Sequence, residues 1–197
     1  MARNTNRTAN KRREESGEVV RPDTLVVTSG RYGSCTQYTK WLINATGCDA
    51  ISFSRKTLGY VSFYRNVIFI GPIRDAEISG VNMMWQNYNN FALEGRKIIV
   101  CGVGLGDPEN EQYRDKVMKR SGSLPQYCSF YILPGKIDRS ALNLLDKPQF
   151  DKFLLDAERI YGTETAQLIL RRSVDNYNGI DSKALTPVID EILATRE

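Results

Sequence analysis

"TLVVTSGRYGSCTQYTKWL", residues 24–42, is the stretch that decides the predicted fold. Its first residues are apolar and β-branched, as in a buried strand, and its last residues place Tyr38, Trp41 and Leu42 at helical spacing. Between them lies a loop of small residues, "SGRYGSCT" (29–36). Such a loop is either an ordinary strand-to-helix turn or a cradle for a phosphate group, because backbone N–H groups at a helix N-terminus attract anions.

The length and charge of the chain indicate one globular domain with a basic tail. The 197 residues contain no apolar run near the roughly 20 residues that span a bilayer. Residues 1–22 carry six Arg or Lys and three Glu, which leaves 21 basic and 20 acidic residues in the remainder. We therefore expect a solvated, disordered tail and a nearly neutral domain without a nucleic-acid-binding face. A tail that tethers the domain to nucleic acid or to an anionic membrane is the weaker alternative.

Histidine is absent, and the four cysteines are Cys35, Cys48, Cys101 and Cys128. The absence of histidine excludes Ser-His-Asp and Cys-His catalysis, and the wide cysteine spacing signals no metal site. A reduced, cytoplasmic location fits these cysteines best. Cys35 falls in the opening loop at an expected helix N-terminus. It is therefore either a thiol with a lowered pKa or a residue that packs and caps.

Strands and helices alternate along the chain after the tail. Continuous apolar runs predict strands at 24–29, 49–54, 66–71, 97–104 and 128–135, and helical spacing predicts helices at 35–46, 78–93 and 109–120. This order is typical of a doubly wound α/β fold with a parallel sheet. We divide the chain into the tail (1–22), an α/β core (23–139) and a helical extension packed on the core (140–197).

Three loops leave the expected carboxyl ends of strands: 29–36, 71–79 and 102–110. Ligands of open α/β sheets bind at this edge, and each loop is rich in Gly or Pro, so the backbone can approach a ligand closely. In the first loop, hydroxyl groups, backbone N–H groups and Arg31 favour a phosphomonoester. The pattern matches neither the dinucleotide-binding fingerprint nor the P-loop.

Four segments in order carry a resemblance to the flavodoxin-domain family, over about residues 23–195. The phosphate-type loop comes first, followed by "NVIFIGPIRDAEISG", "LEGRKIIVCGVGL" and "FYILPGKIDRSALNLLDK". These segments resemble the branch of the family that includes the bacterial menaquinone-dependent protoporphyrinogen oxidases. The resemblance implies a flavodoxin-like, five-stranded parallel sheet in the order 2-1-3-4-5 with extra C-terminal helices, and noncovalently bound FMN.

The resemblance also implies which residues would contact FMN. The phosphate would be held by the first loop, and the isoalloxazine ring would lie between the second and third loops. By position, the phosphate residues are Ser29, Arg31, Tyr32, Gly33, Ser34, Cys35 and Thr36, and the ring residues are Pro72, Ile73, Arg74 and Asp75 on one side and Val103, Gly104, Leu105 and Gly106 on the other. No catalytic residue is implied. Arg74 is expected either to tune the flavin by its charge or merely to pair with Asp75 or solvent.

Three departures from the family pattern leave two functions open. Cys35 stands where the loop Thr is expected, the second loop is one residue shorter with the charged pair Arg74 and Asp75, and neither ring loop contains an aromatic residue. The first hypothesis is an FMN-dependent electron carrier or small oxidoreductase that acts with a redox partner or on a quinone or porphyrinogen-like molecule. The alternative is a binding or regulatory module that has weakened or lost FMN binding. In either case the C-terminal helices could supply a homodimer surface.

Overall fold

A five-stranded parallel sheet forms the centre of the protein. The computed structural model describes residues 23–54, 58–122, 128–174 and 176–195, so the predicted tail, residues 1–22, lies outside the described residues. The sheet order is β2 (Asp49–Ser52), β1 (Thr24–Thr28), β3 (Asn66–Arg74), β5 (Lys97–Gly104) and β6 (Cys128–Pro134). The predicted order 2-1-3-4-5 is confirmed, since β5 and β6 are the fourth and fifth main strands.

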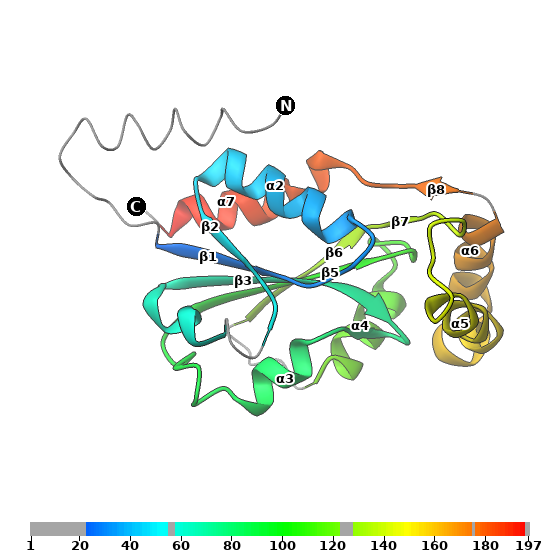
Figure 1. Ribbon diagram of the computed structural model, residues 1–197, viewed down its shortest axis with the longest axis horizontal. Helices are drawn as coiled ribbons and strands as arrows, with labels where there is room; N and C mark the ends of the chain where they lie inside the picture. Colours follow the sequence, from blue (N-terminus) through cyan, green and yellow to red (C-terminus); the bar gives the residue numbers. More distant parts are fainter. Residues whose placement is uncertain (1–22, 55–57, 123–127, 175, 196–197) are drawn as a thin grey trace.

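Helices cover both faces of the sheet, as the continuous apolar strands predict (Figure 1). One face packs on α2 (Ser34–Thr46) and α7 (Thr186–Ala194), and the other packs on α3 (Val81–Gln86) and α4 (Glu111–Arg120). Alternate strand residues divide between the two cores: Val26 faces α2 and α7, whereas Leu25 and Val27 face the opposite side. Two 3-10 helices, η1 (Leu58–Phe63) and η2 (Ser182–Leu185), complete the connections.

The C-terminal part of the chain covers an end of the sheet before it returns to a face. Helices α5 (Asp146–Tyr161) and α6 (Thr163–Val174) lie together beyond the carboxyl ends of the strands (Figure 1). In the sequence, β7 (Lys136–Ile137) precedes this helical pair and β8 (Tyr177–Asn178) follows it, and the two strands pair as an antiparallel ribbon. The three ligand-type loops therefore open toward α5 and α6.

The helix predicted at 78–93 is wrong in most of its length. Residues Glu77–Ile78 form β4, which folds back antiparallel on β3, and the helix that follows, α3, ends at Gln86. The hairpin forms because β3 continues to Arg74 and uses the following residues as a tight turn. The helix stops early because the run "NYNN" (87–90) is poor in helix formers.

Glycines in the third loop make room for side chains of neighbouring elements. A Cβ atom at Gly104 would lie 2.5 Å from the hydroxyl of Tyr113 and 2.9 Å from Cδ1 of Ile73, and one at Gly106 would lie 2.4 Å from Cζ of Tyr113. Tyr113 is 2% exposed and belongs to the core. These glycines are therefore required by packing, in addition to any role in the approach of a ligand.

We expect Gly106→Ala to destabilise the protein by about 1–3 kcal/mol, because the added methyl group overlaps the buried ring of Tyr113. The matched control is Gly59→Ala in η1, where no atom lies within 4 Å of the added Cβ and little change is expected. Urea unfolding followed by circular dichroism measures both variants. Equal stability of the two variants would show that the third loop relaxes freely around Tyr113.

Candidate functional site

The three predicted loops line one cavity at the carboxyl end of the sheet. The cavity has a volume of about 200 Å³ and is closed on its far side by α5 and α6. Twelve of the fifteen residues predicted from the sequence line it: Arg31, Tyr32, Gly33, Ser34, Cys35, Pro72, Ile73, Arg74, Asp75, Val103, Gly104 and Leu105. The structure thus brings together segments that are far apart in the chain, while their contact with a cofactor stays a prediction.

The remaining three predicted residues lie off the cavity. The Ser29 hydroxyl donates a hydrogen bond to the carbonyl of Ser79 at 3.0 Å and so joins the first loop to the end of the second. Thr36 lies in the first turn of α2 and is exposed. Gly106 packs against Tyr113, as described above. Ser29 and Gly106 therefore help to position the loops without lining the cavity themselves.

The first loop presents an uncapped helix N-terminus. Helix α2 begins at Ser34, its N-cap is Gly33 at φ +86°, and no side chain caps it by a hydrogen bond. Gly30 at φ +133° lets the chain turn sharply after β1, in a conformation that side chains rarely adopt. Backbone N–H groups in the first turn have no acceptor within the helix, so they favour an anion at this end of the cavity.

Cys35 is a packed thiol. The residue is 3% exposed, and its Sγ atom would lie 3.1 Å from a Cβ atom at Gly30. Burial raises the pKa of Cys35 to about 12, and this effect outweighs a lowering contribution from Arg74. The hypothesis of a thiol with a lowered pKa is therefore wrong, and the packing interpretation holds.

The second loop is a tight hairpin with two residues in the left-handed region. Asp75 (φ 50°) and Ala76 (φ 63°) form the turn between the paired residues Arg74 and Glu77, which is the pattern of a type I′ turn. The buried N–H of Ala76 donates a hydrogen bond to the hydroxyl of Tyr161 at 2.7 Å. The end of α5 therefore holds the turn in place.

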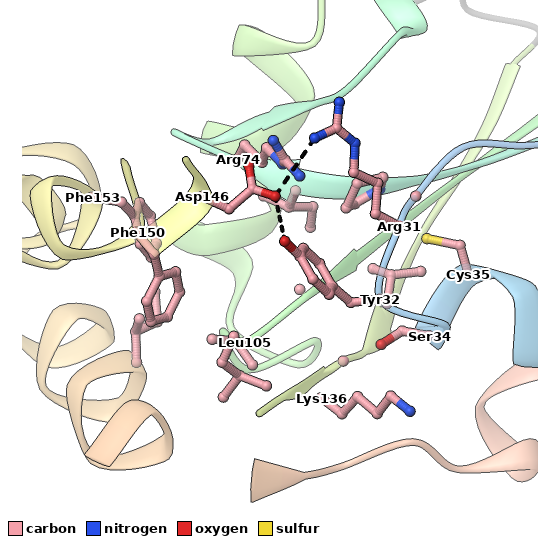
Figure 2. A pocket seen from close by; sticks show the side chains of 18 of the residues that line it. Arg31, Tyr32, Ser34, Cys35, Arg74, Leu105, Lys136, Asp146, Phe150 and Phe153 are labelled. Carbon is pink, nitrogen blue, oxygen red and sulfur yellow. Dashed lines mark hydrogen bonds and ion pairs between the residues drawn. The ribbon is translucent and has the colours of Figure 1, made fainter. Parts of the chain in front are cut away.

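Asp146 joins the first loop to the start of α5. Its Oδ2 accepts a short hydrogen bond from the Tyr32 hydroxyl and one of 2.9 Å from Nδ2 of Asn143, and it lies 3.6 Å from the Arg31 guanidinium (Figure 2). The Tyr32 hydrogen bond is the main cause that lowers the pKa of Asp146, assisted by the charges of Arg74 and Arg31. The same hydrogen bond raises the pKa of Tyr32. Sequence reasoning missed Asp146 because Arg31 and Tyr32, its partners in the first loop, lie more than a hundred residues away.

Aromatic residues enter the cavity from the C-terminal helices. Phe150, Phe153 and Tyr161 of α5 line it together with Tyr113 of α4 and Ile169 of α6. The rings form a continuous group, with centroids 5.8 Å apart for Phe150 and Phe153 and 6.1 Å apart for Phe153 and Tyr161. The loops themselves lack aromatic residues, as the sequence indicates, apart from Tyr32. The spacing of Phe150, Phe153 and Tyr161 predicts a buried helix face but not the element that the face covers.

A side chain of helix α6 is hydrogen-bonded to the backbone of the third loop. The Arg172 guanidinium donates hydrogen bonds to the carbonyls of Leu105 at 2.7 Å and Gly106 at 2.9 Å, and it stacks 4.9 Å from the ring centroid of Tyr177. The second and third loops are thus each tied to the C-terminal helices, through Tyr161 and Arg172 respectively. This arrangement fixes the width of the cavity between them.

Metal-ligand groups and membrane-spanning helices are both absent from the described residues. No group of three or more potential metal ligands occurs among them. Every helix in the described segments is too short or too polar to cross a membrane.

The family comparison agrees with this architecture. A family model for the flavodoxin domain matches residues 25–158, so the chain belongs to the flavodoxin domain family. The match does not distinguish the branch of the family, and the resemblance to the protoporphyrinogen oxidase branch stays a prediction. No curated protein matches the chain.

Several solved structures are similar to the chain at low identity. A flavodoxin, WrbA-like protein from Agrobacterium tumefaciens is 12% identical over 76% of this chain and 98% of that chain, with a TM-score of 0.39. Oxidised flavodoxin 2 from Bacillus cereus is 13% identical with the same coverage and a TM-score of 0.40. Rubredoxin oxygen:oxidoreductase from Desulfovibrio gigas is 13% identical over 84% of this chain and 41% of that chain, with a TM-score of 0.38.

We expect Asp146 to make the protein sensitive to acid. Its folded pKa is lowered, so its contribution to stability is present above the unfolded value of about 3.9 and is lost as the pH falls through the folded pKa. The melting temperature of the wild type should therefore fall more steeply below about pH 4 than that of Asp146→Asn. Asp115→Asn, at an exposed position of α4, is the control and should follow the wild type. Parallel curves for the wild type and Asp146→Asn would contradict this role.

We expect the native protein to resist thiol reagents at Cys35. Burial limits access, and a pKa of about 12 leaves little thiolate at neutral pH. Alkylation by iodoacetamide, mapped by mass spectrometry, should label Cys35 slowly in the native protein and rapidly in urea. Rapid native labelling at Cys35 would contradict the packing interpretation.

Proposed function

We propose that this chain binds FMN noncovalently and works as a flavodoxin-type redox protein. Membership of the flavodoxin domain family supports the redox class. The observation that carries the proposal is the single cavity into which all three loops open, with an uncapped helix N-terminus at one end and aromatic side chains at the other. A ligand with a phosphate group and a planar ring system matches both ends.

The residues present fit such a cofactor. The first loop offers backbone N–H groups and the Ser34 hydroxyl to a phosphate, and its two positive-φ glycines keep side chains away from the chain turn. Apolar side chains of Leu105, Phe150 and Phe153 offer contact area to a ring. When bound, the flavin would supply the electron-transfer chemistry, and the protein would bind, orient and electrostatically tune it.

Arg74 is the residue that we propose as the tuning group. Its side chain lines the cavity, and a cation beside a flavin favours the anionic reduced form. None of the ion pairs found in the described parts of the chain joins Arg74 to Asp75. The charge of Arg74 instead acts on Asp146, whose carboxylate would moderate the effect of Arg74 on the cofactor (Figure 2).

A small molecule is the favoured redox partner. Helices α5 and α6 lie against the second and third loops through Tyr161 and Arg172, so a docking protein would meet these helices before it met the loops. The nearly neutral domain also lacks the strong charge that steers protein partners to acidic electron carriers. We propose a quinone-like or porphyrinogen-like substrate for a cytoplasmic protein, with a homodimer as the assembly to test.

The alternative is a module of the same fold that has lost the cofactor. The observation that favours it is Cys35, which buries a sulfur atom where the family pattern places a hydroxyl donor. The absence of aromatic residues from the ring loops no longer favours it, because α5 supplies aromatic side chains to the same cavity.

We expect the purified protein to be yellow and to release FMN on denaturation. Protein stripped of flavin should quench FMN fluorescence on titration. Its melting temperature should rise with FMN, since a ligand at 100 times its Kd adds about 2.7 kcal/mol. A colourless protein that neither quenches FMN fluorescence nor gains thermal stability from it would overturn the proposal and leave the cofactor-free module.

A further inference from the structure

Lys136 comes to the first loop from a strand that sequence reasoning did not place in the site. It is the first residue of β7, directly after Gly135. The backbone there is fixed on both sides: the Gly135 N–H donates to the carbonyl of Gly104 at 2.7 Å, the Gly179 N–H donates to the carbonyl of Gly135 at 3.0 Å, and Lys136 pairs with Asn178. The backbone of Lys136 is therefore held in place beside the cavity that this residue lines.

The ammonium group of Lys136 lies next to the N-cap of α2. A Cβ atom at Gly33 would lie 3.6 Å from its Nζ and 3.9 Å from its Cε. Figure 2 shows the side chain extended below Ser34, toward the start of the helix. A cation at this position faces the positive end of the helix dipole, which is an unfavourable arrangement by itself.

None of the ion pairs in the described segments includes Lys136, although its charge helps to lower the pKa of Asp138, two residues further along the chain. The first turn of α2 also contains no acidic residue, and no side chain caps the helix. Two positive features, the ammonium group and the helix N-terminus, thus face the same end of the cavity without a protein anion between them. A bound anion would satisfy both.

Arg31, the cation that the sequence suggests for this task, is directed elsewhere. Its guanidinium lies 3.6 Å from Asp146, and in Figure 2 it is on the side of Tyr32 away from Lys136. Tyr32 therefore lies between Arg31, which is paired with Asp146, and Lys136. Lys136 on β7 thus adds positive charge beside the first loop, in addition to that of Arg74, which also acts on Cys35.

We propose that Lys136 is the counter-charge of the cofactor phosphate and makes the site select the phosphorylated flavin over riboflavin. This inference rests on the proposed function. A lysine ammonium suits the task because its three donors rotate freely around a flexible stem and can follow the phosphate oxygens. Lys136 is exposed, so its attraction for the phosphate is screened by salt.

The test compares FMN and riboflavin binding to flavin-free wild type, Lys136→Met, Lys136→Arg and Lys119→Met. Lys119 is an exposed lysine of α4, so its replacement changes the net charge equally without touching the cavity. We expect Lys136→Met to weaken FMN binding about ten-fold or more, as for a lost charge-assisted hydrogen bond, and to leave riboflavin binding unchanged. Lys136→Arg should retain most of the preference for FMN, and Lys119→Met should match the wild type.

Fluorescence titration at low and high salt provides the affinities, and circular dichroism confirms that each variant folds. Added salt should weaken FMN binding to the wild type more than to Lys136→Met. If the wild type binds FMN and Lys136→Met changes the two affinities equally, or changes neither, the inference is overturned while the proposed function stands. If the wild type binds neither flavin, the proposed function fails and the inference falls with it.

Discussion

The hydrogen bond between the Ala76 N–H and the Tyr161 hydroxyl ties the site together. Ala76 is fully buried in a left-handed turn, and a buried N–H without an acceptor costs about 1–3 kcal/mol. Tyr161 therefore ends α5 beside the second loop, where its ring also packs against that of Tyr113, with the centroids 5.3 Å apart and the planes inclined at 54°. From this fixed point α5 runs back to Asp146 and the first loop. The hydrogen bond from the Ala76 N–H thus helps to position the aromatic side chains of α5 that line the cavity.

Charged side chains lie at different places around the cavity, with Asp146 on α5 and Lys136 on β7. Asp146, at the start of α5, is buried. It accepts a hydrogen bond from Tyr32 and pairs with Arg31, and the charge of Arg74 helps to lower its pKa. Lys136, on β7, is left beside the uncapped start of α2. An anion is therefore favoured at the α2 end, while the opposite end offers apolar and aromatic contact area.

The sequence was sufficient for the sheet and for the loops, because both depend on local patterns. Continuous β-branched runs predicted the strands, and parallel strands place all three ligand loops at one edge. It was insufficient where distant residues decide the structure: the helix expected at 78–93 gave way to a hairpin held by Tyr161, and the roles of Lys136, Asp146 and Phe153 depend on packing. Cys35 was identified as unusual, but its burial, and hence its raised pKa, could be seen only in three dimensions.

The long separation of the contacts that close the cavity sets the order of events during synthesis. Tyr32 and Asp146 are 114 residues apart, and Ala76 and Tyr161 are 85 residues apart. A chain that leaves the ribosome from its N-terminus, at roughly 5–20 residues per second, exposes the first loop well before α5 and α6 exist to cover it. The pocket is therefore completed only after α5 and α6 have been synthesised, and until then the residues of the first loop that line it are open to the surrounding solution.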